Sequence, residues 1–265
     1  MTVRQAYAYC VEKLGKADGA ILFSHLTGMN TAQMLSSPDQ NTDADFDAAI
    51  QRALTGEPIQ YIVGTTEFMS LPFKVTPAVL IPRQDTETLV EFALEQLKDV
   101  KNPAGLDLCT GSGCIAVSLA HYAGAKMQAV DLSAQALAVA KENGAENRVQ
   151  IQWILADAKT FSDAENVDFV VSNPPYIESA VVDSLEKKVK DFEPRMALDG
   201  GADGLDFYGC IAKNSKKMLK KGGFLAVEIG YNQGNAVKNI FESVFENTVV
   251  LQDLCGNDRV VYAFK

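Results

Sequence analysis

The chain has 265 residues, of which 47% are hydrophobic, so it can build one large domain or a medium domain with a small companion. Its formal net charge of −10 disfavours nucleic acid as the main partner, because phosphate backbones attract basic surfaces. The first residues lack the apolar core of a signal peptide, and no apolar run reaches the roughly 18 residues of a membrane span, which predicts a cytoplasmic protein with no membrane partner.

Cysteine and histidine are too scattered to indicate a metal site or a hydrolase. The five cysteines are an odd number, and only Cys109 and Cys114 lie near each other in the sequence. The two histidines, His25 and His121, are isolated in the sequence, so a catalytic pair of a nucleophile and a histidine is not indicated. We therefore expect reduced thiols, no metal and no acyl hydrolysis.

The first part of the chain has the spacing of amphipathic helices. Apolar residues recur with a helical period over 3–14, and a second amphipathic segment over 43–54 ends at Gly56 and Pro58. Between 61 and 83 the pattern changes to short β-like pieces punctuated by prolines, as in a connector. A helix is predicted to begin near Asp85, whose side chain suits an N-cap.

From residue 104 onward, apolar strands alternate with segments long enough for helices. The strands are in "GLDLCTGSGC", "KMQAVDLS", "VQIQWILADA", "VDFVVSNPPY" and "GGFLAVEIG". This alternation is typical of an α/β protein with a parallel, doubly wound sheet. Two more strands, "NTVVLQDL" and "DRVVYAFK", flank a short turn in which Gly256 and Asn257 suit a hairpin, so an antiparallel pair is expected to finish the sheet.

The segment "LDLCTGSGCIAVSLA" predicts a strand, a glycine turn and an apolar helix. Gly111 and Gly113 let a ligand lie against bare backbone at the helix N-terminus, which suits a nucleotide-like cofactor. Asp131 follows Gly111 by 20 residues, at a strand end where a carboxylate accepts hydrogen bonds from ribose hydroxyls. NAD and S-adenosylmethionine both carry that ribose. Asp107 favours S-adenosylmethionine, because a carboxylate suits the methionine ammonium better than a pyrophosphate.

The strand "VDFVVS" stops abruptly at Asn173, Pro174, Pro175 and Tyr176. In a doubly wound sheet the carboxyl ends of the strands form the ligand crevice, so this turn is expected beside the glycine loop. The prolines remove two N–H donors and leave rigid carbonyls, Asn173 adds a side-chain oxygen, and Tyr176 adds an aromatic face.

A planar NH2 group matches this turn, because its hydrogens can bond the Asn173 oxygen and the Pro174 carbonyl while its lone pair meets a sulfonium methyl. The alternative is that Asn-Pro-Pro only terminates a strand. Combined with the glycine loop and Asp131, the turn indicates amino-methyl transfer.

Six segments, in this order, resemble the HemK/PrmC-type protein-glutamine methyltransferases, and the match extends over most of the chain. They are "GEPIQYIVGTTEF" (56–68), "VLIPRQDTETLVE" (79–91), "LDLCTGSGCIAVSLA" (106–120), "SNPPYI" (172–177), "EPRMALDGGADGLDFY" (193–208) and "EIGYNQG" (228–234).

The resemblance implies a seven-stranded, Rossmann-like methyltransferase sheet with an antiparallel last strand. It implies a helical domain for partner recognition over 1–58, a β-hairpin linker over 59–83 and the methyltransferase domain over 84–265. The implied reaction moves a methyl group from S-adenosylmethionine to the side-chain amide nitrogen of the Gly-Gly-Gln glutamine of peptide chain release factors, in translation termination. A release factor is then the protein partner, and the enzyme is expected to be a monomer that binds no nucleic acid directly.

By position, the resemblance also implies the site residues. Cofactor binding falls to Asp107, Cys109, Thr110, Gly111, Ser112, Gly113, Asp131, Asp157, Ala158 and Asn173. The glutamine amide falls to Asn173, Pro174, Pro175 and Tyr176, with Asn173, Pro174 and Tyr176 as the catalytic group. Two positions depart from the family pattern, since Cys109 replaces a usual glycine and Gln84 a frequent proline. We expect the small Cys109 to tighten the loop backbone.

Other classes of protein stay open from the residues alone. An exocyclic-amine methyltransferase of the N6-adenine type would use a similar turn on nucleic acid, but the first 83 residues carry 6 basic and 8 acidic residues, a poor surface for it. A non-catalytic S-adenosylmethionine-binding scaffold would dock a partner through its helical N-terminus, and the intact "SNPPYI" argues against it. An NAD oxidoreductase would transfer hydride and no methyl group.

Overall fold

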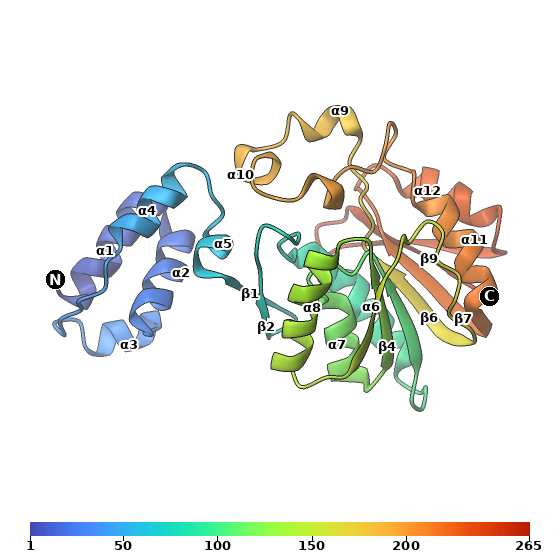
Figure 1. Ribbon diagram of the computed structural model, residues 1–265, viewed down its shortest axis with the longest axis horizontal. Helices are drawn as coiled ribbons and strands as arrows, with labels where there is room; N and C mark the ends of the chain where they lie inside the picture. The colour runs from blue at the N-terminus through green and yellow to red at the C-terminus, as the bar shows by residue number, and fades with distance from the viewer. The chain divides into compact units, whose positions relative to one another are not determined.

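The computed structural model describes all 265 residues, and the chain divides into two compact units (Figure 1). The first unit contains Met1–Thr65 together with the short segment Glu186–Phe192. The second unit contains Thr66–Leu185 and Glu193–Lys265.

The first unit is helical. Its helices are α1 (Val3–Leu14), α2 (Lys16–Thr27), α3 (Thr31–Ser36), α4 (Asp47–Leu54), α5 (Ile59–Val63) and α10 (Lys187–Lys190). A capping box between Thr2 and Gln5 fixes the start of α1. α1 and α2 approach closely at Gly19, where a Cβ atom would lie 2.7 Å from the backbone of Cys10. Their contact therefore depends on a residue without a side chain.

The secondary structure of this unit differs from the sequence prediction at two places. The helix over 3–14 is confirmed, whereas the next predicted helix begins at Asp47 instead of residue 43. Residues 59–63, expected to open the β-hairpin linker, form α5, and this stretch of the helical unit extends to Thr65 instead of residue 58. The reason is burial, because Ile59 and Val63 belong to the hydrophobic core of the helical unit.

The β-hairpin consists of β1 (Thr65–Phe68) and β2 (Leu71–Lys74). Its two turn residues, Met69 and Ser70, have φ values of 51° and 58°, as a two-residue turn between twisted strands requires. The expected N-cap at Asp85 is wrong. Residues Gln84–Thr86 form a 3₁₀ turn (η1) before α6 (Glu87–Leu97), and the Asp85 carboxylate lies 3.0 Å from the Arg259 guanidinium.

The second unit is built on a seven-stranded sheet with the order β5-β4-β3-β6-β7-β9-β8. In chain order, the strands are β3 (Ala104–Leu108), β4 (Lys126–Asp131), β5 (Ile151–Leu155), β6 (Val167–Ser172), β7 (Leu219–Glu228), β8 (Asn247–Gln252) and β9 (Asp258–Phe264). The first five run parallel to one another, while β9 is antiparallel to both β7 and β8. The predicted doubly wound sheet with an antiparallel last strand is confirmed.

Helices cover both faces of this sheet (Figure 1). They are α6, α7 (Cys114–Ala123), α8 (Ala134–Glu146), α11 (Tyr208–Met218) and α12 (Gly234–Glu242), with the short α9 (Ser179–Val182) and η2 (Arg195–Ala197) between β6 and α11. The segment between β5 and β6 contains no helix, and its Phe161 and Ala164 pack directly into the core. From β3 to β5, successive strands are added on one side of β3, and from β6 onward they are added on its other side. The strand order therefore changes direction between β3 and β6, and the carboxyl ends of these two parallel strands form the crevice.

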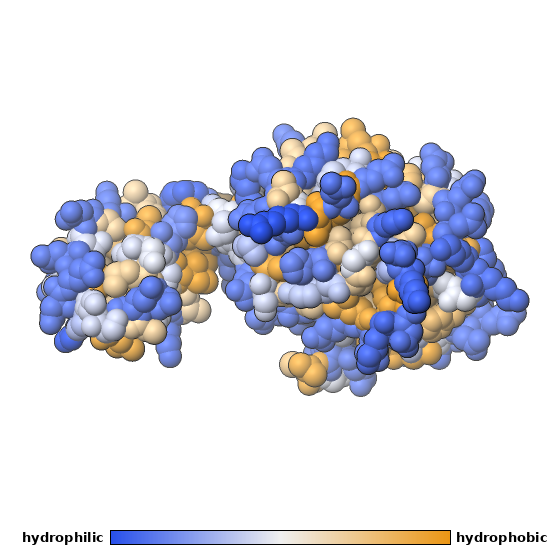
Figure 2. Space-filling model, turned by 90° about the horizontal axis from the view of Figure 1, so that it is seen from below, coloured by the Kyte–Doolittle hydropathy of each residue, from blue (hydrophilic) through white to orange (hydrophobic).

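The face of the molecule seen in Figure 2 is mainly polar. Figure 2 shows hydrophilic residues over most of the visible face of each unit, interrupted by smaller hydrophobic areas. Among the helices, none combines the length and the apolar character that a membrane span needs.

Candidate active site

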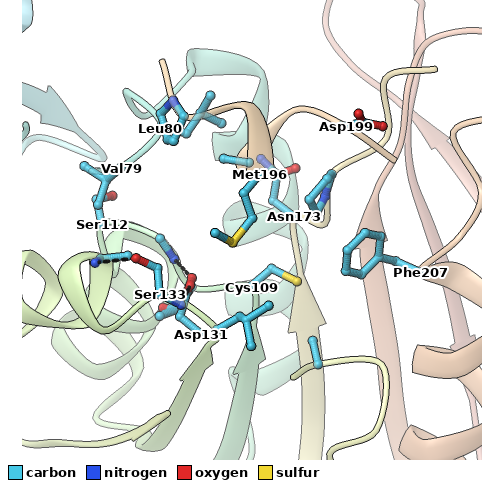
Figure 3. Close-up of a pocket in the computed structure, with 18 of the residues that line it drawn as sticks. Val79, Leu80, Cys109, Ser112, Asp131, Ser133, Asn173, Met196, Asp199 and Phe207 are labelled. Carbon is cyan, nitrogen blue, oxygen red and sulfur yellow. Dashed lines mark hydrogen bonds between the residues drawn. The ribbon is translucent and has the colours of Figure 1, made fainter. Parts of the chain in front are cut away.

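A cavity of about 620 Å³ lies in the second unit at the carboxyl ends of the parallel strands (Figure 3). Its wall combines residues from five places: the stretch before η1, the glycine loop, the ends of β4 and β5, the turn after β6, and residues 194–207. In Figure 3, Met196, Cys109 and Asn173 surround the middle of the cavity, with Asp131 and Ser133 below them. The topology therefore brings together the two motifs that the sequence separates by about 60 residues.

The glycine loop joins β3 to α7 by a series of left-handed residues. Cys109, Gly111 and Gly113 have φ values of 60°, 55° and 81°. A Cβ atom on Gly111 would meet no protein atom within 4 Å, whereas one on Gly113 would lie 3.1 Å from both Ala140 and Trp153. Gly111 thus leaves open space and Gly113 allows close packing. The positive φ of Cys109 is a conformation that side chains rarely adopt, which agrees with the expectation that a glycine is usual at this place in the family pattern.

Asp131, at the end of β4, connects the loop to the next strand. One carboxylate oxygen accepts the Gly111 N–H at 2.8 Å, and the other accepts the Ser133 N–H at 2.8 Å (Figure 3). Burial raises the pKa of Asp131, while these backbone donors lower it. A carboxylate has about four acceptor positions. Each Asp131 oxygen accepts one backbone hydrogen bond, so further acceptor positions stay available for the hydroxyls of a ribose. The site therefore fits a nucleoside-containing cofactor.

Asp107 lies beneath the glycine loop. It is fully buried beneath the loop and lies outside the cavity wall, and one of its oxygens accepts a 2.5 Å hydrogen bond from the Thr110 hydroxyl. Burial raises its pKa to about 7. Asp107 thus holds the loop from below, and its direct contact with a methionine ammonium stays a prediction.

The other expected cofactor residues are divided between the cavity wall and its support. Cys109, Thr110, Gly111, Ser112, Asp131, Asp157, Ala158 and Asn173 all line the cavity, and Gly113 does not. Asp157 accepts the Lys159 N–H at 2.8 Å, which fixes the turn after β5. Gly113 is the N-cap of α7 and allows the loop to pack closely against Ala140 and Trp153.

Asn173 lines the cavity directly after β6, as expected. Its side-chain nitrogen donates to the Thr86 hydroxyl oxygen at 3.1 Å, so its side-chain oxygen is left for a partner in the cavity. Thr86, on the 3₁₀ turn before α6, is almost fully buried. Sequence reasoning missed Thr86, because nothing in its local pattern shows that it meets a residue 87 positions away.

The turn after Asn173 is held from behind. The Gln233 side chain donates to the Tyr176 carbonyl at 2.9 Å and to the Gly204 carbonyl at 3.3 Å. Its oxygen accepts the Gly230 N–H at 2.9 Å, which fixes the orientation of the amide. At Gly200, a Cβ atom would lie 2.7 Å from the Pro175 carbonyl oxygen. The backbone of the turn is therefore clamped between two loops of the second unit.

Tyr176 and Pro174 are placed differently from Asn173 and Pro175. Pro175 lines the cavity, whereas Pro174 and Tyr176 do not. The Tyr176 hydroxyl donates to the Glu228 carboxylate at 3.2 Å, and its ring packs against the core. Burial raises the pKa of Tyr176, so the phenol stays protonated. The aromatic side chain on the cavity wall is Phe207, which the sequence analysis did not single out.

Met196, Phe207 and Leu80 are further wall residues that sequence reasoning missed. All three lie inside segments that carry the family resemblance, but single apolar residues in loops have no chemical signature. Arg83, also on the wall, pairs with the buried Glu193 at 2.5 Å and so ties the stretch before η1 to the loop before η2.

Comparison with known proteins agrees with this geometry. The family model for the Methyltransferase small domain matches residues 84–190, and that for the PrmC N-terminal domain matches residues 5–64. A release factor glutamine methyltransferase of Moorella thermoacetica is 40% identical over 100% of this chain and 99% of its own length, and one of Koribacter versatilis is 37% identical over the same shares. The chain belongs to the release factor glutamine methyltransferase family.

Solved structures confirm the fold of this family member. The hMettl16 catalytic domain has a TM-score of 0.63 at 15% identity, covering 97% of this chain and 92% of its own. A methyltransferase from Pyrococcus furiosus has a TM-score of 0.57 at 16% identity, covering 83% of this chain and 99% of its own. The predicted methyltransferase fold and the predicted family are therefore both confirmed.

Proposed function

We propose that this chain transfers a methyl group from S-adenosylmethionine to the side-chain amide nitrogen of a glutamine in peptide chain release factors. One observation carries the proposal: the free side-chain oxygen of Asn173 lies on the same cavity wall as the glycine loop and Asp131. The curated relatives, aligned over the full chain, bear the name of this reaction.

The glycine loop and the strand ends would hold the cofactor. S-adenosylmethionine supplies an electrophilic methyl group on its sulfonium. Asp131 would bind the ribose hydroxyls, and the backbone at Gly111 would lie against the methionine part, where no side chain intervenes. Asp157 and Ala158 would flank the adenine. Support for this arrangement comes from the shared wall and the carboxylate chemistry.

The turn after β6 would bind the acceptor amide. The Asn173 side-chain oxygen would accept one amide hydrogen, and the Pro174 carbonyl, which accepts no hydrogen bond within the protein, would accept the other. Positive charge grows on the nitrogen as it attacks the methyl group, and two fixed acceptors stabilise that charge. Positioning and polarity then drive the reaction without a general base, because the alkylated amide is acidic enough to lose its proton.

The expected biology follows from this activity. The partner is a release factor, bound as a protein substrate with recognition by the helical unit, and the enzyme acts as a cytoplasmic monomer that does not bind nucleic acid directly. The acidic net charge of −10 supports a protein over a nucleic-acid partner.

The deciding experiment incubates the protein with labelled S-adenosylmethionine and three acceptors: a release factor, its variant with the Gly-Gly-Gln glutamine changed to alanine, and adenine-containing DNA. We expect label on the first acceptor only. Label on DNA would favour the exocyclic-amine alternative, and equal label on both release factors would contradict the assignment of the acceptor.

A further inference from the structure

The linker hairpin is hydrogen-bonded to helix α8 along one edge of β2 (Figure 1). The Asn143 side chain accepts the Lys74 backbone N–H at 2.7 Å and donates to the Lys74 carbonyl at 3.0 Å. The Asn147 side chain donates to the Pro72 carbonyl at 2.9 Å. An edge strand leaves its backbone groups unpaired, so these two side-chain amides take the place of a neighbouring strand.

Asn143 connects this edge of β2 to the glycine loop. Its side-chain nitrogen donates a second hydrogen bond, at 2.9 Å, to the Ser112 carbonyl. The next N–H along the loop, that of Gly113, donates to the Thr110 carbonyl at 2.8 Å. A peptide unit is planar, so bonds at its carbonyl and at its N–H together fix its orientation. The peptide between Ser112, on the cavity wall, and Gly113 is therefore held in one position.

The Asn143 side chain has no hydrogen to spare. It is fully buried, and both hydrogens of its amide nitrogen are used, one by β2 and one by the loop. Its oxygen bonds β2 as well. Releasing either partner would leave a backbone group without a hydrogen bond, which costs free energy in the interior of a protein. The position of β2 and the conformation of the loop are thus linked through one side chain.

We propose that Asn143 is a positioning residue that couples the seating of β2 to the conformation of the glycine loop that binds S-adenosylmethionine. No residue of β1 or β2 lines the cavity, so this amide gives the linker hairpin an indirect part in holding the cofactor. Coupling between two sites is reciprocal, so a cofactor that holds the loop also holds β2. The inference goes beyond the proposed function, because it rests on the cofactor and does not depend on the methyl acceptor.

The first test uses Asn147 as the matched control, because Asn147 bonds the same edge of β2 and has no hydrogen bond to the loop. Asn143→Leu and Asn147→Leu each replace an amide of α8 by an apolar group of similar size. We expect Asn143→Leu to weaken S-adenosylmethionine binding by about 10-fold, because fewer molecules then hold the loop in its binding conformation. Asn147→Leu should bind as the wild type does. Equal affinities of the two variants, measured by titration calorimetry, would overturn the proposal.

The second test uses the wild-type protein and therefore does not depend on how well a variant folds. Hydrogen exchange of the Lys74 amide, whose acceptor is Asn143, should slow by about 10-fold when S-adenosylmethionine is added. The Met69 amide, in the same hairpin, donates to the Glu87 carboxylate and is the internal control, with no change expected. Equal slowing at both amides would indicate general stabilisation of the hairpin, and no slowing at Lys74 would indicate no coupling. Either result contradicts the proposal.

Hydrogen exchange in the two variants assigns the coupling to one side chain. In Asn143→Leu, the Lys74 amide should exchange rapidly with and without the cofactor, because its acceptor is gone. In Asn147→Leu, the cofactor should still slow it. Loss of that slowing in Asn147→Leu would contradict the assignment to Asn143. Methylation of a release factor is tested separately, because neither calorimetry nor hydrogen exchange includes a methyl acceptor.

Discussion

The two halves of the cavity are built in different ways. The cofactor half depends on backbone: left-handed residues in the loop 109–113 and N–H groups that bond Asp131. The acceptor half depends on side chains from distant parts of the chain, since Asn173 meets Thr86 across 87 positions and Tyr176 meets Glu228 across 52. The contacts of the first half reach across 20 positions of the chain, whereas those of the second reach across 52 and 87. Substitutions should therefore affect the two halves separately.

The largest effect is expected for Asn173→Ala, which removes the acceptor facing the cavity. By analogy with the loss of one oxyanion-hole donor, with polarity reversed, the activation barrier should rise by about 3 kcal/mol, a loss of roughly 10²–10³ in kcat. Calorimetry should find that S-adenosylmethionine still binds, because the loop half is intact. An equal loss of binding and turnover would mean that Asn173 belongs mainly to the cofactor half.

The converse result is expected for Asp131→Asn. Charge-assisted hydrogen bonds contribute about 1.5–3 kcal/mol, so the affinity for S-adenosylmethionine should fall by roughly one to two orders of magnitude. Asp163→Asn, in the exposed part of the loop before β6, is the matched control and should bind normally. Affinity unchanged by Asp131→Asn, measured by titration calorimetry, would exclude the ribose role.

Gln233→Met tests whether the acceptor half depends on its buried clamp. The change leaves the Tyr176 carbonyl and the Gly230 N–H without their partner, and the free energy of unfolding should fall by about 1–3 kcal/mol. Denaturant unfolding measures the loss, and kcat should fall with it. The exposed Gln252→Met is the control. Equal free energies of unfolding for Gln233→Met and Gln252→Met would show that the clamp does not stabilise the protein.

The smallest effects separate two glycines of the loop. Both have positive φ, so Gly111→Ala and Gly113→Ala should each lower the free energy of unfolding by about 1 kcal/mol through strain. Gly113→Ala should cost more, because its Cβ would also crowd Ala140 and Trp153 at 3.1 Å. Thermal unfolding gives the order. If Gly111→Ala were the more destabilising, the open space beside Gly111 would be misassigned.

Much of the fold followed from local patterns. Apolar strands alternating with helices predicted the doubly wound sheet, and the "CGND" turn predicted the final hairpin between β8 and β9. The misplaced elements were at boundaries. Residues 59–63 form a helix because Ile59 and Val63 are drawn into the helical core, and Asp85 pairs with Arg259 instead of capping α6. Both outcomes depend on partners that lie far away in the sequence or in the core.

The sequence by itself determined the family, the doubly wound sheet and the two reactive elements, because glycine loops and Asn-Pro-Pro turns carry their chemistry within a few adjacent residues. Only the tertiary structure decided which of these residues face the cavity. Asp107, Tyr176 and Glu228 lie outside the cavity wall, whereas Thr86 lines the cavity and accepts a hydrogen bond from Asn173. The direction of a side chain and its hydrogen-bond partner depend on what packs against it, and that information is spread over the whole chain.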